Sequence, residues 1–482
     1  MDLRSVGLGV SVAFAWLTTG FACGEHAIAA DDAAERDGSP DDNVVDMETD
    51  GAPEAVADVD AETDGDGGGD AGAGSLTVTI LASPGSWGVS WRVRADWEWA
   101  PVEGALVAFD LPDGERRELT AAADGRVTFR DFDWLPGAEA AVTAWADGFG
   151  LASAVGIGPE SSPVLLLPTL GDPSAEGVEV SGTFQNFTDM MNSFLLTSRD
   201  CGGLFWGGID WTFMVPPGTA AELIGFEILP ASRPDGGREN TILGWLVQEV
   251  GPFTEPAVVD LDFAGGASTT RVSGSFRLPA RMDSPLRELV PGCSAVLVHR
   301  PNPGAVFTPI VKGVFGFATT IARRIDGAGW DYELEYVTGL DTTAASTWFE
   351  LHGNGDEYSA LVLPGPPAGG TLDCEFIEPA SLVRPADPSR PHPLHEQITW
   401  TSARSDVTPV VAILDGPACL WWVEGPPGAT SLTVPRTPSA PGARAVLGAE
   451  ARSARVELQA LDGDGECIVA HASTDTFLLV AP

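Results

Sequence analysis

The sequence predicts an all-β protein: tandem antiparallel β-sandwich domains that follow a disordered acidic linker. Three observations predict this class. Short runs of alternating apolar and polar residues recur from residue 75 onward, and Gly, Pro and Asp turns separate them. Helical periodicity is almost absent, with weak candidates only at residues 220–226 and 281–289. An apolar fraction of 44% in 482 residues supplies several packed cores.

Residues 1–22 are typical of an export signal. An uncharged, largely apolar run spans residues 5–22 and ends at Cys23, near the lower length limit for a membrane span. The run and its cysteine resemble a bacterial lipoprotein signal, which implies that Cys23 becomes the lipidated first residue of the mature chain. The resemblance departs at Gly20, where that family prefers Leu. Cleavage after Ala29 is the alternative and would release a secreted protein.

Residues 23–74 form an Asp/Gly/Ala-rich linker. From Glu25 to Gly74 there are 17 carboxylates and one arginine, which gives a net charge of −16. This segment has too little apolar surface to offset its ordering entropy, so we expect a disordered, self-repelling tether. A tether directly after Cys23 favours lipid anchoring over simple secretion.

The net charge of the whole chain is −43, and it excludes a nucleic-acid partner. A surface of this sign repels phosphate and cannot gain free energy from counterion release. The partners that we expect are the membrane, reached through the N-terminal lipid, and a glycan or other envelope proteins.

The first predicted domain spans residues 75–170. Alternating runs at 76–80 and 102–109 are followed by an Asp124-Gly125 turn and by a Pro136-Gly137 turn. This order resembles the carboxypeptidase regulatory-like family, which implies a transthyretin-like sandwich of seven strands. The resemblance also implies a spacer or adhesion module without catalytic residues.

The middle of the chain contains a candidate repeat. Val-Ser-Gly-Thr-Phe at 180–184 recurs as Val-Ser-Gly-Ser-Phe at 272–276, and Cys201 and Cys293 follow the two motifs at the same offset. The repeat predicts one β-sandwich at 178–266 and a second at 269–370. Two strands of one larger sandwich are the alternative.

The last predicted domain, residues 373–482, has strand-like runs at the spacing of a seven-stranded, Ig-like sandwich. Its order resembles a fibronectin type III domain, which implies that Trp400 is the core tryptophan of the second strand. The domain departs from that family in lacking the usual Tyr of the penultimate strand. In the Trp421-Trp422 pair, strand alternation predicts one ring inside and one outside.

Cysteine and histidine patterns give no cofactor or metal site. Beyond Cys23 five cysteines remain, an odd number, and we prefer a disulfide between Cys201 and Cys293 with one more among the last three: Cys374, Cys419 and Cys467. The only histidine cluster is His392 with His395, and the prolines at 391 and 393 preclude the helix that would align both rings.

Tryptophans offer the one candidate ligand site. Trp91, Trp97 and Trp99 lie at separations that place them on one face of a strand, where exposed rings stack on sugars. Core packing is the alternative explanation for these rings.

The sequence therefore predicts a lipoprotein of the bacterial cell envelope. We expect it at the outer membrane, facing the periplasm or the surface, with secretion as the alternative. The predicted role is structural or adhesive display without catalysis. A carbohydrate-binding surface protein that uses residues 87–99 is the second hypothesis, and a hydrolase is the third, because 69 acidic residues satisfy every carboxylate-pair pattern somewhere.

Overall fold

The computed structural model describes residues 74–82, 100–111, 113–134, 139–170, 177–198, 204–215, 217–232, 238–263, 269–277, 290–299, 310–323, 329–338, 345–352, 358–364, 370–371, 376–415, 418–461, 468–472 and 476–481. Within these residues the backbone forms strands β1 to β31 and one helix, α2. The predicted all-β class is therefore confirmed. No helix in these ranges has the length and hydropathy of a membrane span.

The first unit, residues 74–170, is a sandwich of two sheets. One sheet has the order β4-β1-β7, and β3, β2, β5 and β6 pair in that order in the other. The predicted alternation is present in β1, where Leu76 and Val78 are buried and Thr77 is exposed. The strands are β1 (Gly74–Ala82), β2 (Leu106–Asp110), β3 (Arg116–Thr120), β4 (Arg126–Phe132), β5 (Ala140–Trp145), β6 (Leu151–Ile157) and β7 (Val164–Leu167).

A second sandwich follows, with the sheet β10-β9-β12-β13 facing strands that pair with β8. Phe194 of β9 stacks on Phe184 of β8 with ring centroids 4.9 Å apart, which places aromatic rings between the sheets. The strands are β8 (Val178–Gln185), β9 (Ser193–Ser198), β10 (Leu204–Gly207), β11 (Asp210–Val215), β12 (Ala221–Ser232), β13 (Arg238–Val250), β14 (Ala257–Val258) and β15 (Leu261–Asp262).

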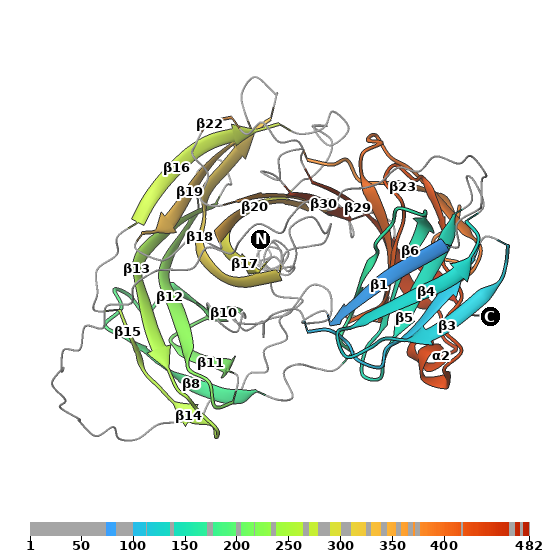
Figure 1. Ribbon diagram of the computed structural model, residues 1–482. Coiled ribbons are helices and arrows are strands. Elements are labelled where there is room, and N and C mark those ends of the chain that lie inside the picture. The colour runs from blue at the N-terminus through green and yellow to red at the C-terminus, as the bar shows by residue number, and fades with distance from the viewer. Residues whose placement is uncertain are drawn as a thin grey trace, which may run out of the picture.

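The next strands form a strongly curved antiparallel sheet. Successive pairs join β16, β19, β18, β17, β20 and β21 in that order, and they follow an arc in Figure 1. The strands are β16 (Thr269–Phe276), β17 (Val290–His299), β18 (Ile310–Arg323), β19 (Trp330–Val337), β20 (Ala345–His352), β21 (Tyr358–Pro364) and β22 (Gly370–Thr371).

The last unit, residues 376–481, sets the small sheet β23-β25-β28 against β26, β27 and β29. Trp400 of β25 is buried between these layers, as predicted for a core tryptophan. The elements are β23 (Ser381–Arg384), β24 (His392–Pro393), β25 (Gln397–Thr401), β26 (Thr408–Asp415), β27 (Ala418–Glu424), β28 (Ser431–Thr433), α2 (Pro441–Leu447), β29 (Arg452–Leu461), β30 (Ile468–Ala472) and β31 (Phe477–Val480).

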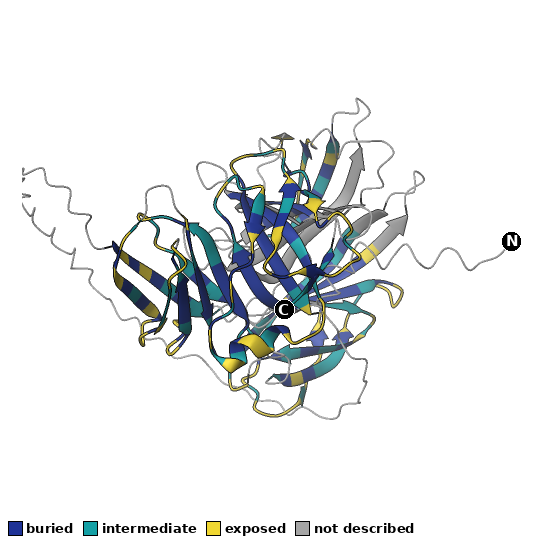
Figure 2. Ribbon diagram, turned by 90° about the vertical axis from the view of Figure 1, so that its right-hand side faces the viewer, coloured by how far each residue is buried: buried dark blue, intermediate teal, exposed yellow. Residues whose placement is uncertain are grey.

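Backbone pairing joins the first unit, the curved sheet and the last unit, whereas the strands of the second sandwich form separate sheets. β21 pairs with β30, β30 with β29, β29 with β26 and β26 with β27, and β27 pairs in parallel with β6 of the first unit. Within the described residues, 17 strands thereby belong to one hydrogen-bonded sheet. Figure 2 shows buried residues along most of the strands, and exposed residues mainly on the loops and on the helix. The sequence predicts separate sandwiches in tandem, and nothing in it signals this shared sheet.

The two Val-Ser-Gly motifs occupy matching places. Gly182 of β8 lies opposite Trp211 of an antiparallel strand, and Gly274 of β16 lies opposite Tyr332 of another. Each motif strand also pairs in parallel with a two-residue strand, β14 or β22. A Cβ at residue 182 would come within 1.8 Å of a backbone oxygen, and one at residue 274 within 2.3 Å, so both positions require glycine. The division into two domains stays a prediction.

One helix prediction was wrong and the other lies outside the described residues. Residues 221–226 belong to β12, which pairs with β9 on one side and β13 on the other. Because residues 223–228 are all buried, the strand lacks the alternation that identifies a half-buried strand. Residues 281–289 are not described. The helix that the structure does contain, α2, begins after Ala440 and ends at Gly448, whose φ is 64°.

Candidate functional site

Most residues predicted for function lie outside the described part of the chain. This holds for the lipidation candidate Cys23, for the ligand candidates Trp91, Trp97 and Trp99, and for Cys201. Cys293 lies on β17, where its backbone pairs with Phe349 of β20. The lipid anchor, the tryptophan site and the Cys201–Cys293 disulfide therefore stay predictions.

Cys419 is the one cysteine whose side chain the described residues define, and it is a free, buried thiol. Burial raises the pKa of this thiol, so it stays protonated and unreactive. A disulfide among the last three cysteines would have to use Cys374 and Cys467, both outside the described residues.

The prediction for the Trp421-Trp422 pair was wrong, because both rings are buried. Trp421 lies in the large core and Trp422 lies on the opposite face of β27 with Val410 and Ala412. Both faces of this strand are covered, since Trp421 and Trp422 belong to core clusters on opposite faces, and β26 and β6 pair with its two edges. Neither ring is available as an exposed platform for a ligand.

The two clustered histidines lie in different surroundings. His395 Nδ1 is 3.0 Å from the carbonyl oxygen of Val434, and the His392 side chain is buried. β24 is a short strand here, in keeping with the two prolines that preclude a helix. In the described ranges no three His, Cys, Asp or Glu side chains gather as a metal site would need.

The structure brings together a different set of residues, at the junction of the first and last units. We use "junction" for the parallel pairing of β6 with β27 and for the contacts of β2, β3 and β5 with residues 436–442. In the pairing, Leu151 to Ala154 lie opposite Trp421 to Glu424. Trp421 Nε1 donates a hydrogen bond of 2.8 Å to Ser153 Oγ, which in turn lies 2.8 Å from Thr143 Oγ1.

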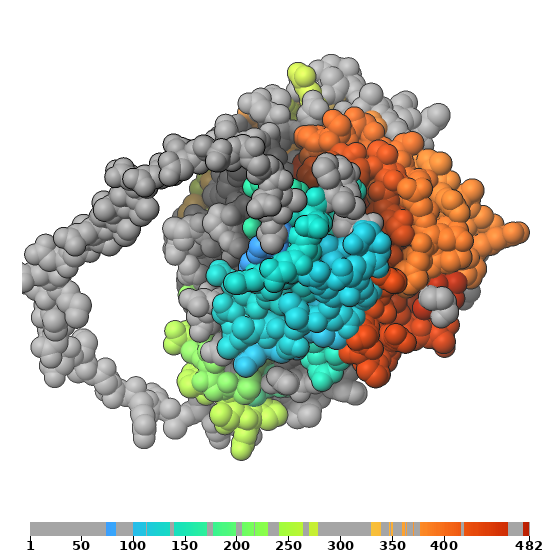
Figure 3. Space-filling view, turned by 45° about the vertical axis from the view of Figure 1, so that its right-hand side comes forward, coloured from blue at the N-terminus to red at the C-terminus, as the bar shows by residue number. Residues whose placement is uncertain are grey.

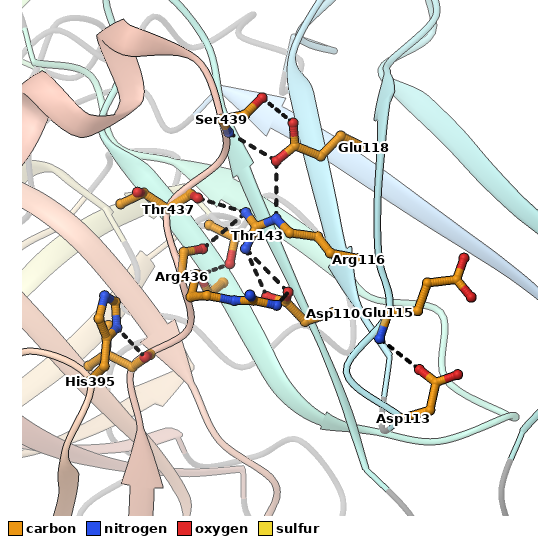
Figure 4. Close-up of polar contacts among 12 residues, drawn as sticks. Asp110, Asp113, Glu115, Arg116, Glu118, Thr143, His395, Arg436, Thr437 and Ser439 are labelled. Atoms are coloured by element: carbon orange, nitrogen blue, oxygen red, sulfur yellow. Dashed lines mark hydrogen bonds and ion pairs between the residues drawn. The ribbon is translucent and has the colours of Figure 1, made fainter.

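Arg116 connects the two units through the edge of the junction (Figure 4). Its Nη2 donates to the carbonyl oxygen of Thr437 at 2.7 Å and to that of Arg436 at 3.3 Å. Its Nη1 donates to both carboxylate oxygens of Asp110 at 3.2 Å, and Asp110 also accepts from Arg436 at 2.7 Å. The guanidinium fork thus binds a carboxylate in one unit and the backbone of the other.

Glu118 extends this network on β3. Its carboxylate accepts hydrogen bonds from the backbone nitrogen of Ser439 at 2.9 Å, from the Ser439 hydroxyl and from Arg116 Nε. Burial opposes ionisation of Glu118, yet these hydrogen bonds outweigh burial and hold its pKa below its ordinary value. The group therefore stays charged and bound at neutral pH.

Helix α2 packs against the first unit at the junction. A Cβ at Gly442 would lie 2.4 Å from Cζ2 of Trp145 on β5, so the helix approaches the ring as closely as glycine permits. Figure 3 shows the first unit and the last unit in contact over a broad surface. The junction therefore combines a shared sheet, a polar network and a packed aromatic ring.

Glu424 ends the β27 strand at the junction, opposite Ala154 of β6 and Val410 of β26. Burial raises the pKa of this carboxyl to about 7. Its charge therefore changes near neutral pH, unlike that of Glu118.

A buried carboxylate also fixes a loop in the second sandwich. Glu227 of β12 is 2% exposed and accepts hydrogen bonds from the backbone nitrogens of Thr188 and Asp189 at 2.7 and 3.2 Å. It also accepts from Asn192 Nδ2 at 2.6 Å and from the Thr188 hydroxyl at 3.1 Å. Part of the acidic excess is therefore structural and lies inside the fold.

No family model and no curated protein matches the chain. Among solved structures, the Bacillus anthracis TIE protein is 10% identical over 63% of this chain and 50% of its own, with a TM-score of 0.16. A candidate adhesin from Bacteroides ovatus is 9% identical over 58% of this chain and 74% of its own, with a TM-score of 0.14. A 1.5-MDa bacterial ice-binding adhesin is 10% identical over 64% and 89%, with a TM-score of 0.11. At TM-scores this low the matches carry no argument.

The chain spans about half the length of the first of these structures. We infer the role of the junction from the contacts of its own residues. It holds two β-units in one fixed arrangement through backbone pairing and charged hydrogen bonds. Sequence reasoning missed Arg116, Glu118 and Ser439, because no spacing pattern connects residues that lie about 320 positions apart.

Proposed function

We propose that this chain is an exported, lipid-anchored protein of the bacterial envelope whose β-units form a stiff platform for structural or adhesive display. The single observation that carries the proposal is the parallel pairing of β6 with β27, which joins the first unit to the last. A display platform requires such a fixed arrangement, because domains joined only by linkers move independently. In this role the chain has no catalytic activity.

The anchor rests on sequence features that support it. An apolar run before Cys23 and a spacer of net charge −16 after it suit a protein held away from a membrane. We place the chain at the outer membrane, facing the periplasm or the surface. The resemblances to a carboxypeptidase regulatory-like domain and to a fibronectin type III domain support a spacer or adhesive role.

The experiment that tests the anchor is mass spectrometry of the mature N-terminal peptide, combined with membrane fractionation. We expect an acylated Cys23 and a membrane-bound chain, and a Cys23→Ala variant should move to the soluble fraction. A mature chain that starts at Ala30 without acylation would contradict the proposal. A Cys293→Ala variant, which leaves the signal intact, is the matched control and should stay membrane-bound.

Sugar binding is the second candidate function. The observation that favours it is the Trp91, Trp97 and Trp99 group, three large rings within nine residues. A glycan array with the full chain and with Trp97→Ala tests this site. Binding that is unchanged in the variant would exclude it.

A further inference from the structure

A surface hollow of about 630 Å³ opens at one end of the last unit, between β23, β25 and the segment that leads into β24. Its volume is in the range of pockets that hold small ligands. The orange part of the last unit, which contains these residues, projects outward from the body in Figure 3. The hollow is lined by Val383, Arg384, Pro385, Ala386, Asp387, Arg390, Pro391, His392 and Thr399.

The segment that forms the wall is held by its own hydrogen bonds. Asp387 Oδ1 accepts from the backbone nitrogen of Ser389 at 3.1 Å and from its hydroxyl at 2.6 Å. The backbone nitrogen of Arg390 donates to the Asp387 carbonyl at 3.2 Å, and Leu478 of β31 donates to the Pro388 carbonyl at 3.3 Å. The wall is therefore preformed, and a ligand would not have to order it.

The hollow carries charged groups in pairs. Arg384 Nη2 lies 2.7 Å from Glu396, just outside the lining, and Arg390 Nε lies 3.1 Å from Asp387. The side chains of Arg384 and Arg390 are 53% and 84% exposed. A guanidinium has five N–H donors and each of these ion pairs engages one nitrogen, so donors and carboxylate acceptors both face solvent.

The paired charges at the hollow disfavour the binding of an anion. The two arginines and two carboxylates cancel locally, while the chain as a whole carries −43, and its field repels a negative ligand. Alternating donors and acceptors suit a group that both donates and accepts, and a hydroxyl does so. The apolar side chain of Val383, 55% exposed, and the exposed Pro391 add a surface for the C–H face of a ring.

His392 is one of the residues that line the hollow. It is buried, with 7% exposure, and its Nε2 has no hydrogen-bond partner. A buried polar atom without a partner is uncommon in folded proteins and costs free energy. Because this nitrogen is closed to solvent, it is an unsatisfied polar group beside the hollow and makes no direct contact with a ligand there.

We propose that the hollow at residues 383–399 is a binding site for a neutral saccharide. Arg384, Arg390 and the carboxylate of Asp387 hydrogen-bond the ring hydroxyls. The site is separate from the tryptophans at 91–99. It does not depend on lipidation of Cys23, so a failure of sugar binding and a failure of membrane anchoring are separate results.

The test is saturation-transfer NMR and calorimetry on the full chain with galactose, N-acetylglucosamine and maltose as probes, and with glucuronate and inorganic phosphate in parallel. We expect saturable binding of at least one neutral sugar. Arg390→Ala, at a side chain that is 84% exposed, should weaken that binding by about fivefold, as the loss of one hydrogen bond does. Arg384→Ala should weaken it similarly.

Arg444→Ala is the matched control, because Arg444 is exposed on α2 and does not line the hollow. It should leave the dissociation constant unchanged. Three results would overturn the proposal: no saturable binding of any neutral sugar, binding of glucuronate or phosphate alone, or binding that Trp97→Ala abolishes while Arg390→Ala does not.

Discussion

The indole nitrogen of Trp421 donates a 2.8 Å hydrogen bond to the hydroxyl of Ser153, across 268 residues of sequence. Both side chains are buried, and the bond crosses from the last unit to the first. Four other buried indole nitrogens in the described ranges have no hydrogen-bond partner: those of Trp211, Trp245, Trp330 and Trp400. Trp421 at the junction therefore differs from these four tryptophans, because its buried indole nitrogen has a hydrogen-bond acceptor.

We expect Ser153→Ala to lower the free energy of unfolding by about 1–3 kcal/mol, because a buried indole N–H loses its acceptor. Urea denaturation followed by tryptophan fluorescence measures the change. Ser75→Ala is the control, since Ser75 is exposed on β1, and its effect should stay within about 0.5 kcal/mol. Equal midpoints for the two variants would refute a stabilising role for the bond.

Arg116→Ala should loosen the junction without unfolding either unit. The variant removes two hydrogen bonds to the backbone at residues 436 and 437 and two ion pairs, one with Asp110 and one with Glu118. Hydrogen exchange of the β6 and β27 amides should then rise by at least about tenfold.

Arg117→Ala is the matched control for Arg116. Arg117 is the next residue on β3, and its hydrogen bonds to Glu115, Arg130 and Asp131 stay within the first unit. Its loss should affect exchange in the first unit and leave β27 unchanged. Similar exchange of β27 in both variants would mean that Arg116 does not bridge the units.

Glu424 makes stability depend on pH. The ordinary pKa of its carboxyl is 4.5, and burial raises it to about 7 in the folded protein. Between these values the folded protein holds a proton that the unfolded chain releases, so this group lowers stability as pH rises from 4.5 to 7. Above pH 7 the destabilisation is complete and constant.

Glu424→Gln removes this dependence. The variant should match the natural protein below pH 4.5 and exceed its unfolding free energy by up to about 3 kcal/mol at pH 8. Urea midpoints measured from pH 4 to 8 give the difference, and Glu450→Gln, at an exposed position, should leave the profile unchanged. A difference that is flat with pH would show that Glu424 titrates normally.

Glu227→Ala should cost at least about 3 kcal/mol of unfolding free energy, because the donors of Thr188, Asp189 and Asn192 are left without an acceptor. Glu227→Gln should cost less than half as much, because an amide oxygen still accepts. Urea denaturation and exchange of the Thr188 amide report both effects. Glu249→Ala, exposed on the neighbouring β13, is the control, and an equal loss there would contradict the argument.

Apolar–polar alternation and turn residues correctly predicted those strands that have one buried face and one exposed face. The alternation at residues 76–80 and the Asp124-Gly125 turn both correspond to structure, with Gly125 at a φ of 70°. The same rule failed for β12 and for Trp421-Trp422, because those strands are covered on both faces. Alternation disappears when neither face meets water.

The junction could not be predicted from the sequence. Ser153 and Thr143 are two small polar residues in neighbouring β-strands that hydrogen-bond to each other, and Ser153 accepts a hydrogen bond from an indole only because β27 lies beside β6. Parallel pairing between distant strands leaves no turn residue or spacing that identifies the partner. A sequence pattern records local geometry, whereas this site is created by contacts at long range.

The pairing of β1 bears on how the protein responds to mechanical force. β1 is the first described strand after the predicted tether, and Thr79 to Ala82 pair in parallel with Val164 to Leu167 of β7. A pull on the tether runs along β1 and loads these hydrogen bonds together in shear, instead of opening them one at a time. β1 also pairs with β4 on its other edge, so hydrogen bonds on both edges of this strand oppose a pull from the N-terminal side.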